Sequence, residues 1–294
     1  MIRALPDAAA QPDGDPVIVR FEHSLARRAV AELVGTALLL FVGAGSIPAL
    51  ILFDHGAGTA FAGADLGLVA LAFGFTVTAL VYVLGPISGC HINPAVTVAF
   101  AATRRFAWRE APAYVVAQLA GATLGSLLLW GMLGSRATRL GHGFGMASFD
   151  GGTTSWASAF LAEALAAGIL VFVVLGAISD RAPQALAGMV IGLALAAIVL
   201  VIGPVTCAAT NPARVFGPLL VQSVDGSGVH NWLQFLAVYT PAELVGAVAA
   251  ALGYDALTER APRARPAHRP RAVARARRAR ARGARAVAAP PRPR

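Results

Sequence analysis

Six stretches of the chain consist almost entirely of hydrophobic residues, and each is long enough to cross a bilayer as a helix of about 20 residues. Their interiors are interrupted by a charge at Glu32, Glu163 and Glu243. The six stretches are Ala29–Leu52, Leu66–Pro86, Ala111–Leu133, Ser155–Ile178, Pro183–Val205 and Trp232–Leu257. The pattern predicts six transmembrane helices.

Two shorter segments, Gly85–Phe100 and Gly203–Leu220, do not fit this pattern. In each, a Gly-Pro pair stands eight residues before an Asn-Pro-Ala triplet. Roughly ten mainly apolar residues follow each Asn, which is too few to cross a bilayer. We therefore expect each segment to dip to the membrane midplane as a re-entrant half-helix.

Further matches indicate an internal repeat. The sequence AELVG at Ala31–Gly35 parallels AEALA at Ala162–Ala166, and YVVAQLAGA from Tyr114 parallels YTPAELVGA from Tyr239. Each half contains three spans, an odd number, so the second half is inserted upside down relative to the first. The predicted fold is an all-α membrane protein with six transmembrane helices and two re-entrant half-helices in an inverted repeat, an arrangement that places a site near the midplane.

The Asn-Pro-Ala triplets have a chemistry that follows from helix ends. Proline suits the first helical turn, where a backbone N–H would be unpaired anyway, and Asn then stands at the cap. Two helix N-termini meeting at the midplane would each contribute about half a positive charge, which opposes cations and hydronium. Uncharged polar solutes could hydrogen-bond to the Asn amides. The predicted pore residues are Asn93, Pro94, Ala95, Asn211, Pro212 and Ala213.

The low content of charged residues agrees with a protein surrounded by lipid. In this chain 13% of the residues are charged, whereas soluble domains contain about a quarter. The excess of basic over acidic residues comes from the end of the chain. Up to Glu259 there are 11 Arg against 15 acidic residues, and the last 35 residues add 13 Arg and no acid. This Arg-, Ala- and Pro-rich tail cannot bury a core and is predicted to be disordered. We expect it to be attracted to anionic membrane lipid; nucleic-acid binding is not expected, because no aromatic residue interleaves the Arg.

The arginines between the spans indicate the orientation. They favour one side of the membrane, with Arg27, Arg28, Arg104, Arg105, Arg109 and Arg181 there and Arg136, Arg139 and Arg214 on the other. By the positive-inside rule both termini are cytoplasmic. The first 25 residues have no apolar core of a signal peptide. We expect a multi-pass protein of the plasma membrane.

The chain resembles the major intrinsic protein family of aquaporins and glycerol facilitators. The resemblance covers about Ala26 to Asp255 and is carried by AELVGT, SGCHINPAVT, NPARVFGP and GAVAAALGYD. It implies a homotetramer in which each protomer has its own pore. We divide the chain into a disordered cytoplasmic N-terminus (1–25), an aquaporin-like channel domain (26–257, with halves of about 26–134 and 155–257) and a disordered cytoplasmic tail (258–294).

The same resemblance implies roles for six further residues. Phe73, Val199, Ala208 and Arg214 are expected to form a selectivity filter, and Glu32 and Glu163 to accept hydrogen bonds from the re-entrant loops. A proton relay through the two carboxylates is the competing interpretation, since buried charges in membranes are costly. Glu243 matches Gln118 and is interpreted as a helix-packing residue. His91 is either a gate or a hydrogen-bonding residue of the loop, and we favour the second. Cys90 and Cys207 are interpreted as small packed residues.

The sequence therefore predicts a passive channel for water and small uncharged solutes such as glycerol, urea or metalloid acids. The alternative is an ion-coupled transporter built on an inverted repeat, a class that usually places ionisable residues at the midplane. We expect no enzymatic activity, cofactor or metal, because no cluster of His, Cys, Asp and Glu has the spacing of metal ligands.

Overall fold

The computed structural model describes residues 22–53, 63–134, 143–224 and 231–258. Across these ranges the regular elements are helices and no strand occurs. The predicted N-terminal segment up to residue 21 and the Arg-rich tail from residue 259 lie outside the described residues. Contacts define one compact unit that ends at Tyr254, and the following unit is described only for the end of the last helix.

Six helical segments in the described ranges are long and apolar enough to cross a membrane. They are Leu25–Phe53, Gly63–Ser88, Ala111–Leu133, Trp156–Ala177, Gln184–Thr206 and Trp232–Thr258. Each overlaps one predicted span, with ends that differ by a few residues. The prediction of an all-α protein with six membrane-spanning helices is confirmed.

Three of these spans are single helices, and the other three combine elements. The single helices are α3 (Gly63–Ser88), α5 (Ala111–Leu133) and α7 (Trp156–Ala177). The first span joins α1 (Leu25–Leu38), the π-helix η1 (Leu39–Ala44) and α2 (Ser46–Phe53). The fifth joins the 3₁₀-helix η2 (Gln184–Leu186) and α8 (Ala187–Thr206), and the sixth joins α10 (Trp232–Gln234), the π-helix η4 (Phe235–Tyr239) and α11 (Thr240–Thr258). Hydropathy did not predict the π-helical segments, because the apolar sequence runs through them unbroken.

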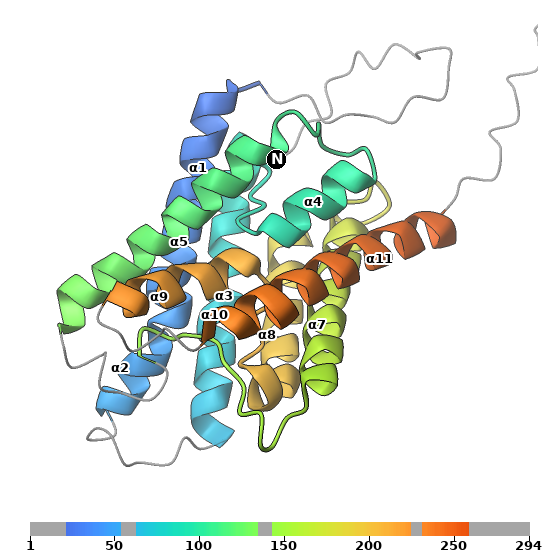
Figure 1. Cartoon of the computed structure of the whole chain (residues 1–294). Coiled ribbons are helices and arrows are strands. Elements are labelled where there is room, and N and C mark those ends of the chain that lie inside the picture. Colours follow the sequence, from blue (N-terminus) through green and yellow to red (C-terminus); the bar gives the residue numbers. More distant parts are fainter. Residues whose placement is uncertain (1–21, 54–62, 135–142, 225–230, 259–294) are drawn as a thin grey trace, which may run out of the picture. The chain divides into compact units, whose positions relative to one another are not determined.

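Two short helices follow the Asn residues, α4 (Pro94–Ala102) and α9 (Pro212–Val224). Figure 1 shows them among the long helices. At 1.5 Å per residue they are about 14 Å and 20 Å long, less than the hydrocarbon core of about 30 Å. Helix α9 has 13 residues, more than the roughly ten expected, and it continues past Pro218 to Val224.

The Gly-Pro pairs belong to the long helices and not to the re-entrant segments. We predicted that the re-entrant segments begin at them, but α3 continues through Pro86 to Ser88, and α8 continues through Pro204 to Thr206. Proline removes a single backbone hydrogen bond in the last helical turn, where the next residues leave the helix in any case. The re-entrant loops proper are therefore short. We call Gly89–Asn93 the first loop and Cys207–Asn211 the second loop.

The two halves of the repeat meet where α3 packs against α8. The crossing lies at Gly74 and Gly192, which are related by the same shift of 118 residues that relates Asn93 to Asn211. A Cβ atom added to Gly74 would lie 2.7 Å from the backbone oxygen of Gly192, and one added to Gly192 would overlap the backbone oxygen of Gly74. Glycine at both positions therefore lets the two backbones touch.

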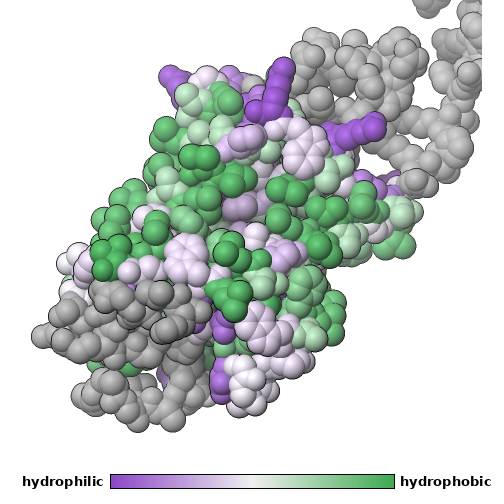
Figure 2. Space-filling view, in the orientation of Figure 1, coloured by the Kyte–Doolittle hydropathy of each residue, from purple (hydrophilic) through white to green (hydrophobic). Residues whose placement is uncertain are grey.

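The outer faces of the long helices are apolar. Large hydrophobic side chains are exposed on five different spans: Val30 is 60% exposed, Phe75 64%, Val116 65%, Leu161 59% and Val201 72%. Figure 2 shows hydrophobic residues over much of the described surface, with strongly hydrophilic residues gathered where Figure 1 places the start of α1 and the turn between α4 and α5. Apolar surface of this extent marks an interface with lipid or protein.

Candidate functional site

The two Asn side chains cap the two short helices. Asn93 Oδ1 accepts a hydrogen bond from the backbone N–H of Ala95 at 2.8 Å, and Asn211 Oδ1 accepts one from Ala213 at 3.0 Å. Each Asn is followed by a proline at the first helical position, as expected at a helix start. The cap orients each side chain, so that its amide nitrogen points away from its own helix.

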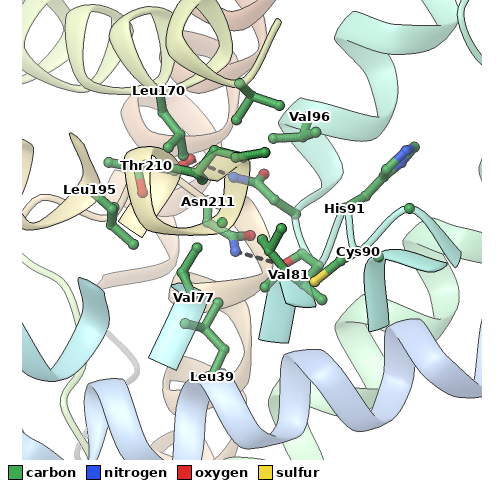
Figure 3. Close-up of a pocket in the computed structure, with 18 of the residues that line it drawn as sticks. Leu39, Val77, Val81, Cys90, His91, Val96, Leu170, Leu195, Thr210 and Asn211 are labelled. Carbon is green, nitrogen blue, oxygen red and sulfur yellow. Dashed lines mark hydrogen bonds between the residues drawn. The ribbon is translucent and has the colours of Figure 1, made fainter. Parts of the chain in front are cut away.

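The Asn amide nitrogens join the two loops to each other. Asn93 Nδ2 donates to the backbone oxygen of Thr210, and Asn211 Nδ2 donates to that of Ile92, both at 2.9 Å. Figure 3 shows these hydrogen bonds crossing between the loops, with aliphatic side chains around them. The sequence predicts amides that can donate into a pore; in the structure one N–H of each amide is used between the loops, and each amide carries a second N–H. The N-terminal ends of α4 and α9 therefore meet.

Both loops hold non-glycine residues in the left-handed region of backbone conformation. The φ angles are 51° at Cys90 and 42° at Ile92 in the first loop, and 44° at Ala208 and 57° at Thr210 in the second. The two pairs are again separated by 118 residues. Such a conformation costs about 1–3 kcal/mol per residue and persists only where surrounding contacts impose it.

In the first half those contacts come from Glu32 on α1, a fully buried carboxylate. It accepts hydrogen bonds from the backbone N–H groups of His91 at 2.9 Å and Ile92 at 2.6 Å. It also accepts one from the Ser88 hydroxyl at 2.6 Å and one from Gln118 Nε2 at 2.8 Å. Four donors from two helices and the loop thus converge on one carboxylate.

In the second half two carboxylates, Glu163 and Glu243, accept the hydrogen bonds of the loop backbone. Glu163 on α7 accepts from the backbone N–H groups of Ala209 at 3.0 Å and Thr210 at 2.9 Å. Glu243 on α11 accepts from the backbone N–H of Asn211 at 2.9 Å. Glu243 is fully buried, as a helix-packing residue would be, and it also contacts the second loop directly.

A cavity of about 640 Å³ runs past both loops. Most of its wall is aliphatic, with side chains from α3, α7 and α8 such as Val77, Leu170 and Leu195, as Figure 3 shows. Among the predicted site residues, Phe73, Asn93, Val199, Ala208, Asn211 and Arg214 line it. Pro94, Ala95, Pro212 and Ala213 lie behind the Asn residues in the helices, and Glu32 and Glu163 lie behind the loops; none of these six borders the cavity.

Arg214 lies in the first turn of α9 and is 1% exposed. Its guanidinium carbon is 5.7 Å from the centre of the Phe73 ring. Its Nε, Nη1 and Nη2 atoms have no hydrogen-bond partner among the described residues. A buried guanidinium with unused donors on a cavity wall is suited to bind the oxygen atoms of a small solute.

His91, Cys90 and Cys207 lie in or next to the two loops. The His91 ring lies 5.0 Å from the rings of Phe100 and Phe106, and its Nδ1 is 3.1 Å from Thr97 Oγ1. His91 also lines the cavity, and in Figure 3 its ring points away from the labelled aliphatic side chains. Cys90 is a free thiol that borders the cavity, and Cys207 Sγ donates to the backbone oxygen of Ser148 at 3.4 Å. In the described ranges no group of three or more His, Cys, Asp or Glu residues could hold a metal ion.

Two contacts were missed by the sequence reasoning. One is the pair of hydrogen bonds between the loops, for which the sequence holds no signal beyond the two Asn residues. The other is the contact of Glu243 with Asn211, which the repeat could have suggested: Gln118, the residue that matches Glu243, contacts the carboxylate that supports the first loop.

Comparison with known proteins agrees with this geometry. The sequence model of the major intrinsic protein family matches residues 20–254. Aquaporin AqpM of Methanothermobacter marburgensis is 38% identical over 246 residues, which cover 80% of this chain and 98% of that protein. Nodulin-26 of Glycine max is 39% identical over 231 residues, covering 78% of this chain and 77% of its own.

A solved structure has the same fold. The aquaglyceroporin from Plasmodium falciparum superimposes with a TM-score of 0.69 at 25% sequence identity, covering 79% of this chain and 96% of that one. The described ranges contain six helices that are long and apolar enough to span a membrane, and with these relatives they make the protein a multi-pass membrane protein. The chain belongs to the major intrinsic protein family, whose members are channels for water and small solutes and not enzymes.

Proposed function

We propose that this channel passes water together with small uncharged polar solutes such as glycerol, urea or undissociated metalloid acids, and excludes ions. The observation that carries the proposal is Arg214, which borders the cavity and whose three guanidinium nitrogens have no hydrogen-bond partner among the described residues. Facing Phe73, it offers donors to solute oxygens on one side and an aromatic wall on the other. The cationic guanidinium repels cations at the same point.

The small size of the two remaining filter residues supports a pore wider than one for water alone. Val199 is 3% exposed and Ala208 is 4% exposed, and both border the cavity. Water-selective members of the family typically carry His at the position we assign to Val199. An isopropyl group in place of an imidazole widens the opening and makes one wall apolar, which suits the carbon backbone of a polyol.

Passive flux fits the buried carboxylates better than ion coupling does. Glu32 and Glu163 are fully buried, stand behind the loops and bind backbone N–H groups. A coupling site needs ionisable groups that a transported ion can reach, and these two are fully occupied with the loops. We therefore expect solute flux to require only a solute gradient.

The assembly and the location of the protein are also part of the proposal. The apolar outer faces of the spans suit contacts with lipid and with other copies of the chain, and family membership favours a homotetramer. The arginines around Arg28 and Arg104 favour cytoplasmic termini in the plasma membrane by the positive-inside rule. The Arg-rich tail would then lie on the side of the anionic lipids.

Light scattering on reconstituted vesicles tests the width of the pore. Wild-type protein should pass water and at least one of glycerol, urea and boric acid above the rate of empty vesicles. Val199→His should lower solute flux several-fold while water flux persists, because the imidazole narrows the opening. Val199→Ala, the matched control, removes bulk at the same position and should not lower solute flux.

Two results would contradict the proposal. Wild-type vesicles that pass water and none of these solutes would show that the pore is narrow. Solute flux that is the same in Val199→His and in wild type would show that Val199 does not stand at the constriction.

A further inference from the structure

The aromatic ring of Phe73 packs against a glycine that does not itself border the cavity. Phe73 on α3 lines the cavity, whereas Gly43 is a buried residue of the π-helix η1 and is absent from the cavity wall. A Cβ atom added to Gly43 would lie 2.6 Å from Phe73 Cδ1, 2.7 Å from Cε1 and 3.1 Å from Cγ. Carbon atoms in favourable contact are about 3.5–4.0 Å apart. The ring therefore occupies the space that any side chain at position 43 would need.

The backbone of α3 is held in place at the residue that follows Phe73. A Cβ atom added to Gly74 would lie 2.7 Å from the backbone oxygen of Gly192 on α8, and one added to Gly192 would lie 3.2 Å from the backbone carbon of Gly74. Because the two backbones already touch, α3 has no room to move toward α8. The position of the Phe73 backbone is thus fixed by contact between the two halves of the repeat.

The backbone of the first span is held in a similar way by α5. A Cβ atom added to Gly125 on α5 would lie 2.4 Å from the backbone oxygen of Ala37 and 2.9 Å from Leu40 Cβ. The hydroxyl of Ser46 donates to the backbone oxygen of Gly43 at 2.7 Å. Protein interiors are packed too tightly to absorb an extra methyl group without a shift of some atoms. Since η1 has no room to move toward α5, a group added at position 43 has to displace the Phe73 ring.

The cavity is the open space available to a displaced ring. Phe73 and Arg214 both line the cavity, and the guanidinium carbon of Arg214 lies 5.7 Å from the centre of the ring. A movement of the ring into the cavity would change the opening beside the guanidinium. The contact between Gly43 and Phe73 therefore bears directly on which solutes can pass.

We infer that Gly43 determines the specificity of the channel, because the absence of a side chain there seats the Phe73 ring against η1 and leaves the opening beside Arg214 wide. Gly43 acts through Phe73 and is a positioning residue. This role rests on the proposed function, in which Phe73 belongs to the filter. The width of the pore is then set by the first span as well as by the filter residues that border the cavity.

Permeability measurements on vesicles that contain the full chain test this role. In Gly43→Ala the glycerol and urea permeabilities should fall several-fold relative to the water permeability, because the ring moves into the cavity. A mere loss of folded protein would lower all permeabilities alike and leave the ratio unchanged. Gly67→Ala on α3 is the matched control, since nothing lies within 4 Å of its added Cβ; its ratio should equal that of wild type.

A double variant tests whether Gly43 acts through the ring. In a Phe73→Ala background there is no ring to displace, so Gly43→Ala should cause no further change in the ratio. If Gly43→Ala alone fails to fold, Phe73→Ala should restore folding in the double variant, because the overlap is removed. Fluorine NMR of para-fluorophenylalanine placed at position 73 reports the ring itself: its signal should shift in Gly43→Ala and stay unchanged in Gly67→Ala.

Three results would overturn the inference. The fluorine signal could be the same in Gly43→Ala as in wild type, which would mean that the ring has not moved. The ratio could stay at its wild-type value in Gly43→Ala, or it could fall equally when Phe73 is already alanine. A wild-type channel that passes water alone would contradict the proposed function. In that case a shifted fluorine signal with lower water permeability in Gly43→Ala would still support the role of Gly43, and no change in either would overturn it.

Discussion

At the scale of single residues, each re-entrant loop depends on a buried carboxylate, Glu32 or Glu163, that accepts several hydrogen bonds. Glu32 and Glu163 each receive two consecutive backbone N–H groups of a loop and one hydroxyl. This explains how residues such as Cys90 and Ala208 remain in the left-handed region. A carboxylate is well suited to this purpose, because its two oxygens accept several hydrogen bonds at once.

Removing one of these carboxylates should therefore strongly lower both the stability of the protein and its water flux. Glu32→Ala leaves the backbone N–H groups of His91 and Ile92 buried without an acceptor, and Gln118 loses its partner. Since each buried unsatisfied group costs about 1–3 kcal/mol, we expect a stability loss of more than about 3 kcal/mol and loss of water flux. Thermal unfolding in detergent measures the first effect. Asp150→Ala, at an exposed turn, is the control and should change little; equal losses in both variants would contradict the argument.

At the scale of helices, close packing depends on glycines at matched positions of the two halves. A Cβ atom on Gly121 of α5 would overlap the backbone oxygen of Leu33 on α1, and one on Gly246 of α11 would overlap that of Ala164 on α7. Gly121 and Gly246 follow Gln118 and Glu243 by three residues in each half. The same contacts that bring these helices together thus bring the supporting side chains to the loops.

A substitution at one of these glycines should separate the helices. Gly121→Ala forces α5 away from α1, and we expect a loss of about 1–3 kcal/mol, the usual cost of overpacking. Gly131→Ala in the same helix is the matched control, because nothing lies within 4 Å of its added Cβ; alanine there should be neutral or slightly stabilising. Thermal unfolding of both variants in detergent is the measurement. A Gly121→Ala protein as stable as Gly131→Ala would mean that the two helices tolerate the displacement.

The helices also show how far the sequence alone can lead. Span positions were predictable, because a membrane requires long apolar stretches and the loops between them are polar. The half-helices were predictable from their length and from the repeat. The π-helices η1 and η4 and the continuation of α3 past Pro86 were not, because backbone hydrogen-bond register leaves no mark in hydropathy. The contact of Glu243 with Asn211 was not predictable for a related reason: a buried polar contact depends on the rotation of α11, which periodicity alone does not fix.

At the scale of the whole channel unit, function depends on the contact between the two loops, to which both halves of the repeat contribute. Neither loop is complete alone, since Asn93 binds the backbone of the second loop and Asn211 binds that of the first. The repeat therefore brings two helix N-termini to the same part of the cavity. Each contributes about half a positive charge within its first turn, in surroundings with little water to screen it.

We expect this arrangement to exclude protons while water passes. A permeating hydronium ion would meet the two helix ends and the guanidinium of Arg214 along one cavity, and every one of these groups is positive. Like charges in a poorly screened site repel strongly, whereas a neutral water molecule can accept the remaining Asn93 and Asn211 amide hydrogens. A pH-sensitive dye inside vesicles under a membrane potential should report proton conductance no greater than that of empty vesicles, with water flux well above it.

A variant at the N-terminal end of α4 tests whether the helix ends cause the exclusion of protons. Asn93→Asp keeps the oxygen that caps α4 but removes the amide donor to Thr210, and it adds a negative charge where the two helix dipoles converge. We expect proton leak to rise in this variant. Asn231→Asp is the matched control, because Asn231 stands at the start of α10 and does not border the cavity; it should leave the barrier intact. Wild-type vesicles that conduct protons well above empty ones would refute the barrier itself. An Asn93→Asp channel as tight as wild type would place the barrier at Arg214, because the helix ends would then contribute little.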